Sequence, residues 1–316
     1  MNRLLLTDTH FGWKQNSTTW LQSQLKFIDK QIIPYLKQNP VDKVIHLGDV
    51  FDSRSSISPM TATIVRDKFI EISGLCKEFI IIAGNHDFYS PNNATYDTLS
   101  MVFRNCGIQL VIDDVLVEDN DVFVPWYQYK KDISNILHDH PEINNIYTHA
   151  DIIGEDREYT SLYKGKHIFS GHIHTPLINR ESRLYNLGSC YSLNFADANS
   201  SRFAYTWDDE SLKSIENQNS IKFWRITDND FFHPLHDPGD YYEFYIKQSN
   251  MQTTKYQARA LEIADKYRNY NIIPVSEDKI YEDIEFETYN IDELCRSSIP
   301  NHLRDKFNKV INAVAD

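Results

Sequence analysis

Aspartate, asparagine and histidine residues recur in five short motifs within the first 174 residues. Each motif ends or follows an apolar run, and the motifs are Asp8-Thr9-His10, Gly48-Asp49, Gly84-Asn85-His86-Asp87, Thr148-His149 and Gly171-His172-Ile173-His174. None contains cysteine, so the set offers oxygen and nitrogen atoms but no thiolate. Such a set suits divalent ions of borderline to hard character, such as Mn²⁺, Fe²⁺ or Zn²⁺.

Two of these motifs indicate how the side chains are aimed. Residues two apart on a strand share a face, so His172 and His174 are expected to point the same way, with Ile173 on the opposite face. Asp49 follows a central strand and is the expected bridge between two ions. One carboxylate can hold two cations roughly 3.5–4 Å apart and lower the pKa of a shared water.

The elements that position these motifs alternate between strand and helix in the first half of the chain. Apolar runs predict strands at 3–8, 42–52 and 78–87, and helical spacing of apolar residues predicts helices at 20–37, 59–75 and 95–105. Ser58 and Pro59 supply an N-cap and a first-turn proline. Strands separated by helices form parallel sheets, and ligands collect at the carboxyl ends of such strands. The motifs are therefore expected to meet.

The second half of the chain is richer in strands. Apolar runs predict strands at 109–113, 121–126, 144–150, 166–174, 183–189, 202–207 and 221–227, with a short helix near 130–138. The stretch 228–240 is rich in Asp, Pro and Gly and reads as a boundary. Beyond it we expect a strand at 241–248, helices at 253–268 and 300–315, and a strand at 279–289. This pattern predicts an α/β sandwich with a small α+β appendage.

Composition limits the class of protein. The chain has 316 residues, is 41% hydrophobic, and carries a formal net charge of −13, which argues against coating nucleic acid by charge alone. The negative net charge does not exclude a nucleic-acid site whose local charge is set by bound cations. No apolar run approaches the ~18–20 residues of a membrane helix. Four scattered cysteines and the lack of a signal-peptide core predict an intracellular protein with free thiols.

In this order, the motifs DTH, GDVFD, GNHD, THA and GHIH resemble those of the calcineurin-like metallophosphoesterases. GDVFDSR, with Asp52, and the segment NLGSCYSLNFAD at 186–197 are similar to the SbcD-type nuclease subunits of double-strand-break repair complexes, in their compact phage-like form. The resemblance implies a four-layer α/β/β/α sandwich. It also implies a nuclease domain at 1–230, a capping domain at 231–288 and a helical partner-binding segment at 289–316.

The resemblance further implies a role for each motif residue. One ion would be held by Asp8, His10, Asp49 and His174, and the other by Asp49, Asn85, His149 and His172. His86 would be the catalytic histidine that gives a proton to the departing oxygen, and Asp87 would orient it. Mn²⁺ is the foremost expectation for both ions, with Mg²⁺, Fe²⁺ or Zn²⁺ as alternatives.

For function, the resemblance implies a Mn²⁺-dependent exonuclease and endonuclease that acts on DNA ends, hairpins and single strands. It also implies a homodimer, an SMC-like ATPase partner of SbcC type and a cytoplasmic location, in a host cell if the chain is phage-encoded. A phosphatase, a cyclic-nucleotide phosphodiesterase and a non-catalytic scaffold remain as alternatives. The segment ADANSSRF at 196–203 departs from the Glu…Lys-Gly pattern usual in the family, which leaves the packing there open.

Overall fold

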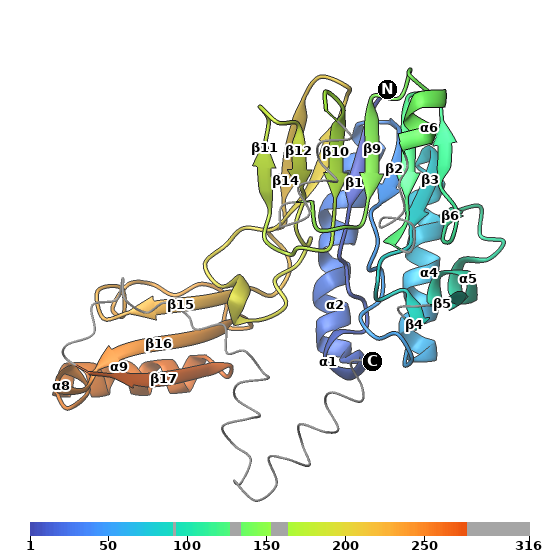
Figure 1. Cartoon of the computed structure of the whole chain (residues 1–316). Helices are drawn as coiled ribbons and strands as arrows, with labels where there is room; N and C mark the ends of the chain where they lie inside the picture. Colours follow the sequence, from blue (N-terminus) through green and yellow to red (C-terminus); the bar gives the residue numbers. More distant parts are fainter. Residues whose placement is uncertain (91–92, 127–133, 153–163, 277–316) are drawn as a thin grey trace, which may run out of the picture. The chain divides into compact units, whose positions relative to one another are not determined.

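The computed structural model describes residues 1–90, 93–126, 134–152 and 164–276 (Figure 1). The chain forms two compact units. The first comprises Met1–Arg225, Leu235–Tyr242 and Tyr267–Tyr270. The second comprises Ile226–Pro234, Glu243–Lys266 and, among the described residues, 271–276. No helix in the described ranges is long and apolar enough to cross a membrane.

The first unit contains two six-stranded mixed sheets. One sheet has the order β14-β13-β1-β2-β3-β6, in which β1, β2, β3 and β6 run parallel, and β13 and β14 are antiparallel. Its strands are β1 (Arg3–Leu6), β2 (Val41–His46), β3 (Cys76–Ile82), β6 (Gln109–Val111), β13 (Phe203–Trp207) and β14 (Leu212–Glu216).

The other sheet has the order β11-β12-β10-β9-β8-β7, with a parallel centre from β12 to β8 and antiparallel edge strands. Its strands are β7 (Leu116–Glu118), β8 (Asp121–Val124), β9 (Asn145–Thr148), β10 (His167–Ser170), β11 (Leu177–Asn179) and β12 (Leu184–Asn186). A separate hairpin pairs β4 (Phe88–Ser90) with β5 (Asn93–Asp97).

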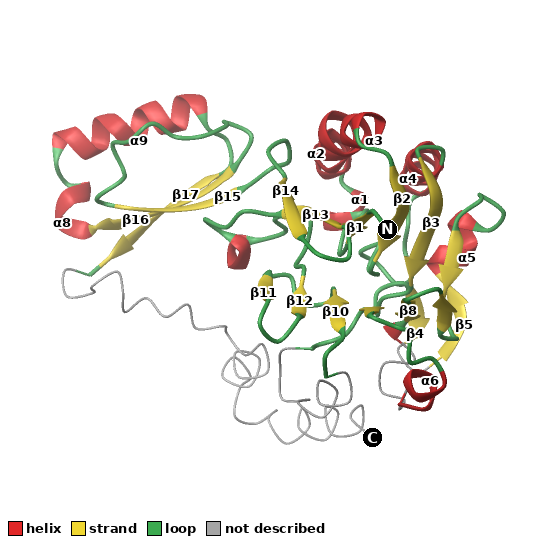
Figure 2. Ribbon diagram, turned by 90° about the horizontal axis from the view of Figure 1, so that it is seen from above, coloured by secondary structure: helices red, strands yellow, loops and turns green. Residues whose placement is uncertain are grey.

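Helices cover the outer face of each sheet. The helical segments of this unit are α1 (Trp13–Asn16), α2 (Thr18–Phe27), the π-helical turn η1 (Ile28–Ile32), α3 (Ile33–Gln38), α4 (Pro59–Ser73), α5 (Thr98–Phe103), α6 (Ser134–Asp139) and the 3₁₀ turn η3 (Phe195–Asp197). Figure 2 shows α2, α3 and α4 on one side of β1–β3 and α6 beyond the second sheet.

Alternation along β1 explains the layers. Leu4 and Leu6 face the core shared with the helices, whereas Leu5 faces the second sheet. There Leu5 belongs to an inter-sheet core with Phe123 and Phe169. A third apolar cluster, which includes Ile136 and Leu137 of α6, lies on the far side of the second sheet. Three cores separate four layers, so the predicted α/β/β/α sandwich is confirmed.

The remaining elements are β15 (Phe223–Thr227), β16 (Tyr241–Lys247) and β17 (Tyr270–Val275), which form a three-stranded sheet, and the helices α8 (Gln248–Met251) and α9 (Thr254–Lys266). The strand β17 has no counterpart in the prediction. The predicted strand at 279–289, the helix at 300–315 and the segment 289–316 lie outside the described residues.

Several predicted elements differ from the structure in type or extent. The predicted helix at 20–37 contains the π-helical turn Ile28–Ile32, and residues 95–97, predicted as helix, belong to β5. Asp97 explains the second difference, because its side chain accepts the N–H of Ser100 and so caps a helix that starts at Thr98. The predicted strand at 166–174 ends at Ser170.

Candidate metal centre

The carboxyl ends of five strands bring the motif residues together. Asp8 and His10 follow β1, Asp49 follows β2, Asn85 follows β3, His149 follows β9, and His172 and His174 follow β10. Three groups of these side chains have ligand atoms within 4.8 Å of one another: Asp8, His10 and His174; His10, Asp49 and His86; and Asp8, Asp49 and His149. Asn85 and His172 join the second half of the site through the contacts given below.

The first half of the site is formed by Asp8, His10 and His174. Nε2 of His10 lies 3.1 Å from Nε2 of His174, and each of these nitrogens lies within 4 Å of Oδ1 of Asp8. The His10 Nδ1 atom is buried and makes no hydrogen bond among the described residues.

The second half of the site gathers around the amide oxygen of Asn85. Nε2 of His149 and Nδ1 of His172 each lie 3.0 Å from this oxygen. Nε2 of His149 also lies 3.3 Å from Oδ2 of Asp49, and that carboxylate lies 3.7 Å from Nε2 of His10. Asp49 therefore stands between the two halves, as a bridging carboxylate would.

The donor set fits divalent cations. Nδ1 of His149 lies 2.7 Å from the carbonyl oxygen of Leu47, so Nδ1 carries the proton and Nε2 of the neutral ring is an acceptor. This lone pair faces the oxygens of Asn85 and Asp49, which are acceptors too. Acceptors that converge on one point need a proton or a cation between them. The set has no thiolate, so it suits oxygen- and nitrogen-binding ions.

The pKa shifts of the side chains indicate where positive charge is held in the site. Burial opposes ionisation of His149, but the Asp49 carboxylate raises its pKa to about 9. Burial also raises the pKa of Asp49, yet the surrounding imidazoles lower it well below its usual range. Burial likewise opposes the charge on His10, and Asp52 with other nearby carboxylates raises its pKa overall. Protons are thus held where cations would neutralise the same carboxylates.

The backbone of the site is strained. Asp8, His10, Asp49 and His172 have φ values of 48°, 44°, 53° and 77°, in the left-handed region that costs a residue with a Cβ roughly 1–2 kcal/mol. Such strain persists only where the surroundings fix it, and it is typical of functional sites. The sequence contained no signal for it.

Buried polar side chains fix the strained Asp8-Thr9-His10 turn. Gln24 of α2 donates to the carbonyl oxygens of Thr9 and His10, and the Ser189 hydroxyl donates to that of Asp8. The sequence analysis did not identify either residue. Gln24 had a signal, because it interrupts the apolar face of the predicted helix at 20–37.

His86, the residue expected to be catalytic, is held by a residue other than the one expected. Nδ1 of His86 lies 2.5 Å from the carbonyl oxygen of Asp52. The oxygens of Asp87 instead accept backbone N–H groups of Gly84, Asp49, Val50 and Phe51. The expectation that Asp87 orients His86 is therefore wrong: Asp87 ties together the loops that follow β2 and β3.

The expectation that His172 and His174 share a strand face is also wrong. Both lie beyond the end of β10, and the left-handed φ of His172 breaks the alternation. His172 reaches Asn85 and His174 reaches His10, so the pair serves both halves of the site.

Trp126 is a further residue of the site. Its ring centroid lies 4.8 Å from that of His172, and its backbone N–H donates to the carbonyl oxygen of Ala83, which follows β3. Burial lowers the pKa of His172, which favours the neutral ring that binds metal. The sequence contains an indication of this role, because Trp126 ends the predicted strand at 121–126, as the other site residues end or follow theirs.

The segment that departs from the family pattern is packed by an ion pair. Nη2 of Arg202 lies 2.6 Å from Oδ1 of Asp197, and both side chains are buried. Arg202 also donates to the carbonyl oxygen of His174, and the other Asp197 oxygen accepts the N–H of Leu193. This pair joins the segment to the backbone of a candidate ligand.

A two-sheet sandwich that gathers Asp, Asn and His beyond its strand ends is the arrangement of a metal-dependent phosphoesterase. The chain belongs to the calcineurin-like phosphoesterase family, whose sequence model matches residues 1–224. The family resemblance predicted from the five motifs is thereby confirmed.

Two known proteins share significant sequence similarity with the chain. It is 27% identical over 234 residues to Exonuclease subunit 1 of Enterobacteria phage T4, over 68% of this chain and 66% of the phage protein. It is 31% identical over 93 residues to the DNA double-strand break repair protein Mre11 of Sulfurisphaera tokodaii, over 29% of this chain and 23% of that protein. The chain thus matches less than two thirds of either relative.

Solved structures also resemble it. A dimetal phosphatase from Danio rerio matches 70% of this chain and 99% of its own, at 13% identity and a TM-score of 0.42.

Proposed function

We propose that this protein is the nuclease subunit of an SbcCD-type DNA repair and recombination complex, and that it hydrolyses phosphodiesters with two metal ions, Mn²⁺ foremost. The observation that carries the proposal is the convergence of seven oxygen- and nitrogen-bearing side chains, with Asp49 between the two halves of the set. The similarity to a phage exonuclease subunit and to an archaeal break-repair protein supports DNA as the substrate.

Two ions would divide the site along the geometry described above. Asp8, His10 and His174 would hold one, Asn85, His149 and His172 the other, and Asp49 would bind both. When bound, two such ions neutralise phosphate charge and lower the pKa of water. The protein holds the ligands in place through the strained turns and their buried supports.

His86 would act as the proton donor to the departing oxygen. The Asp52 carbonyl oxygen accepts from Nδ1, so that proton is fixed and Nε2 is the ring atom left to exchange a proton with substrate. The backbone N–H of His86 also donates to Oδ1 of Asp49 at 2.8 Å, which ties the proposed proton donor to the carboxylate between the two halves of the site. Its ring centroid lies 4.9 Å from that of His10.

The proposal includes two partners and an intracellular setting. An SMC-like ATPase of SbcC type would bind the segment 289–316, and a second copy of the chain would form a homodimer. Exposed Met60 and Ile70 on α4 support an apolar contact between copies. The similarity to a phage protein supports a location in the cytoplasm of a cell.

The proposal is tested by supplying purified protein with Mn²⁺ and a labelled linear duplex, a hairpin and a single strand. Degradation of DNA faster than of a phosphomonoester or a cyclic nucleotide is expected. Faster cleavage of either small ester would favour the phosphatase or cyclic-nucleotide alternative. Intact DNA and intact bis-p-nitrophenyl phosphate with two ions bound would refute the nuclease assignment.

Replacing the proton donor separates chemistry from metal binding. His86→Ala is expected to lower kcat on DNA by roughly 10²–10⁴-fold while the ion content per chain is retained. His149→Ala is the matched control, since loss of a ligand should reduce both. Equal ion loss in the two variants would show that His86 is a ligand instead of the proton donor.

A further inference from the structure

A cleft in the first unit is lined in part by residues that closely follow two loops of the candidate metal centre. It has a volume of about 710 Å³, within the range of ligand pockets, and runs between residues 54–57, the β4–β5 hairpin and α5. Arg54 follows Asp52 by two residues, and Tyr89 follows His86 by three. The Asp52 carbonyl oxygen accepts a hydrogen bond from His86. The segment that leads to Arg54 and the segment that leads to Tyr89 therefore both begin at the proposed proton donor.

The lining of the cleft combines flat apolar rings with cations. Tyr89 is 64% exposed and Tyr96 is 70% exposed, which is unusual for rings of this size unless they contact another molecule. Ring faces exposed in this way stack on nucleobases in proteins that bind single strands.

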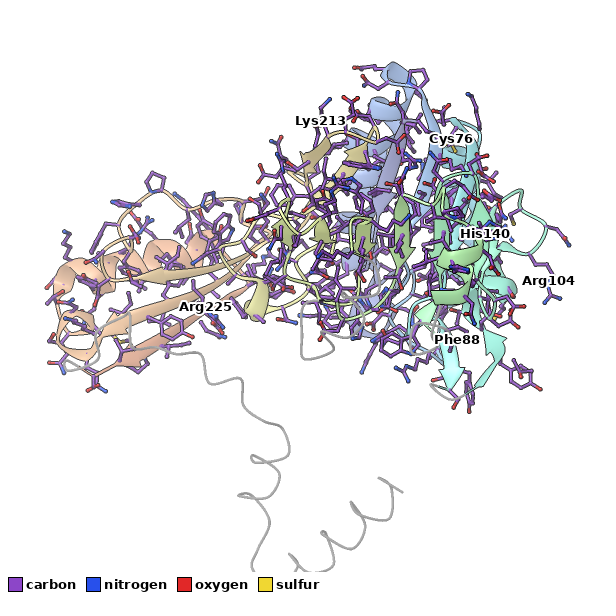
Figure 3. The ribbon with its side chains drawn as sticks, turned by 45° about the horizontal axis from the view of Figure 1, so that its top comes forward. Cys76, Phe88, Arg104, His140, Lys213 and Arg225 are labelled. Carbon is purple, nitrogen blue, oxygen red and sulfur yellow. The ribbon has the colours of Figure 1, made fainter. Side chains whose placement is uncertain are left out.

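The charge of the cleft is positive although the chain as a whole is acidic. Arg54 and Arg104 line it, and neither makes an ion pair within the described residues. Figure 3 shows Arg104 projecting from the edge of the ribbon. The one acidic residue among the lining residues, Asp97, is already bonded to the N–H of Ser100 at 2.5 Å. The two arginines outnumber this carboxylate, so the lining has a net positive charge that favours phosphate groups.

Other basic residues near the motifs do not form such a surface. The Lys14 ammonium lies over the rings of Trp20 and Tyr241, and Arg180 donates to the carbonyl oxygen of Leu212. Of Lys14, Arg54 and Arg180, only Arg54 lines the cleft that holds the exposed rings.

We propose that this cleft binds an unpaired stretch of nucleic-acid strand next to the phosphate to be cleaved. Tyr89 and Tyr96 would stack on bases, and Arg54 and Arg104 would pair with the flanking phosphates. The inference rests on the proposed nuclease function and adds the surface and the four side chains that would hold the unpaired strand.

The test measures binding apart from hydrolysis. Fluorescence anisotropy of a labelled oligo(dT) is recorded with the full chain and EDTA present, so that no cleavage occurs. The double variant Tyr89→Ala/Tyr96→Ala is expected to weaken affinity roughly tenfold or more, and Tyr89→Phe/Tyr96→Phe to restore most of it, because the rings remain. Arg54→Ala and Arg104→Ala should each reduce the salt dependence of log K by about 0.7. Arg183→Ala, an exposed arginine outside the cleft, is the matched control and should bind as the unsubstituted chain does.

Two results would overturn the inference. One is unchanged oligo(dT) affinity in the double alanine variant. The other is an affinity that falls only where sedimentation shows a dimer changed to a monomer, which would make the cleft a contact between copies. Either leaves the nuclease function standing if the unsubstituted chain cleaves DNA. Absence of cleavage with intact oligo(dT) binding would instead reject the nuclease function alone.

Discussion

At the scale of single residues, the site depends on histidines whose protons are positioned by backbone carbonyls. Leu47 accepts from Nδ1 of His149 and Asp52 accepts from Nδ1 of His86, so Nε2 of each ring faces the centre of the site. This is the means by which a protein selects the tautomer of a ligand or proton donor. The residue types could be predicted from the sequence, but the carbonyls that orient them could not, because these lie after β2, 102 positions from His149 and 34 positions from His86.

His46 gives the fold a pH dependence. It is fully buried, and its Nε2 lies 3.0 Å from the Thr9 hydroxyl. Burial lowers the pKa of His46 from 6.5 to about 3, so the folded state resists protonation that the unfolded state accepts. The stabilisation is therefore complete above pH 6.5 and is lost as the pH falls from 6.5 toward 3.

Between pH 7 and pH 5, the free energy of unfolding of the ion-free, unsubstituted protein is expected to fall by about 2 kcal/mol more than that of the ion-free His46→Gln variant. Glutamine keeps a donor for Thr9 but does not titrate. Urea unfolding in EDTA at both pH values measures the difference. Parallel losses in the two proteins would show that His46 is not the titrating group.

At the scale of elements, the candidate ligands lie on turns that follow strands, and glycines let these turns approach one another closely. Gly48 has φ 94°, and a Cβ on Gly84 would overlap the backbone nitrogen and the carboxylate of Asp49. Close approach of this kind is what glycine permits. Strands, helices and strand-end motifs could be predicted from periodicity, whereas the loop geometry and the π-helical turn at Ile28–Ile32 depend on tertiary contacts.

Gly84→Ala tests this approach. The added methyl group must displace Asp49, including its backbone nitrogen, so the affinity for Mn²⁺ is expected to fall at least tenfold and the midpoint of thermal unfolding of the ion-free protein is expected to fall as well. Isothermal titration measures the affinity. Gly107→Ala is the control, because its position has no heavy atom within 4 Å of the added Cβ, although its φ of 71° carries a modest strain. Equal Mn²⁺ affinity for Gly84→Ala and the unsubstituted chain would contradict the account.

At the scale of the first unit, a buried ion pair joins the two sheets at the end opposite the metal centre. Arg3 of β1 forms two hydrogen bonds of 2.9 Å with Asp121 of β8. Asn145 of β9 donates to the same carboxylate. The sequence analysis did not foresee this contact, because Arg3 reads as a polar residue before a strand and its partner lies 118 positions away.

Breaking that pair leaves a buried cation with less compensation. Asp121→Asn is expected to destabilise the protein by about 3–5 kcal/mol, as found when one partner of a buried pair is removed. Asp67→Asn, which removes an exposed partner of Arg66, should cost less than about 1 kcal/mol. Chemical denaturation of both variants decides the matter, and equal costs would show that the Arg3 pair contributes no more than a surface contact.

The most direct test of the central claim is the anomalous scattering of a crystal soaked with Mn²⁺. The account predicts two peaks per chain on either side of Asp49, one against Asp8, His10 and His174 and the other against Asn85, His149 and His172. A single peak, or peaks away from Asp49 at full Mn²⁺ occupancy, would contradict it.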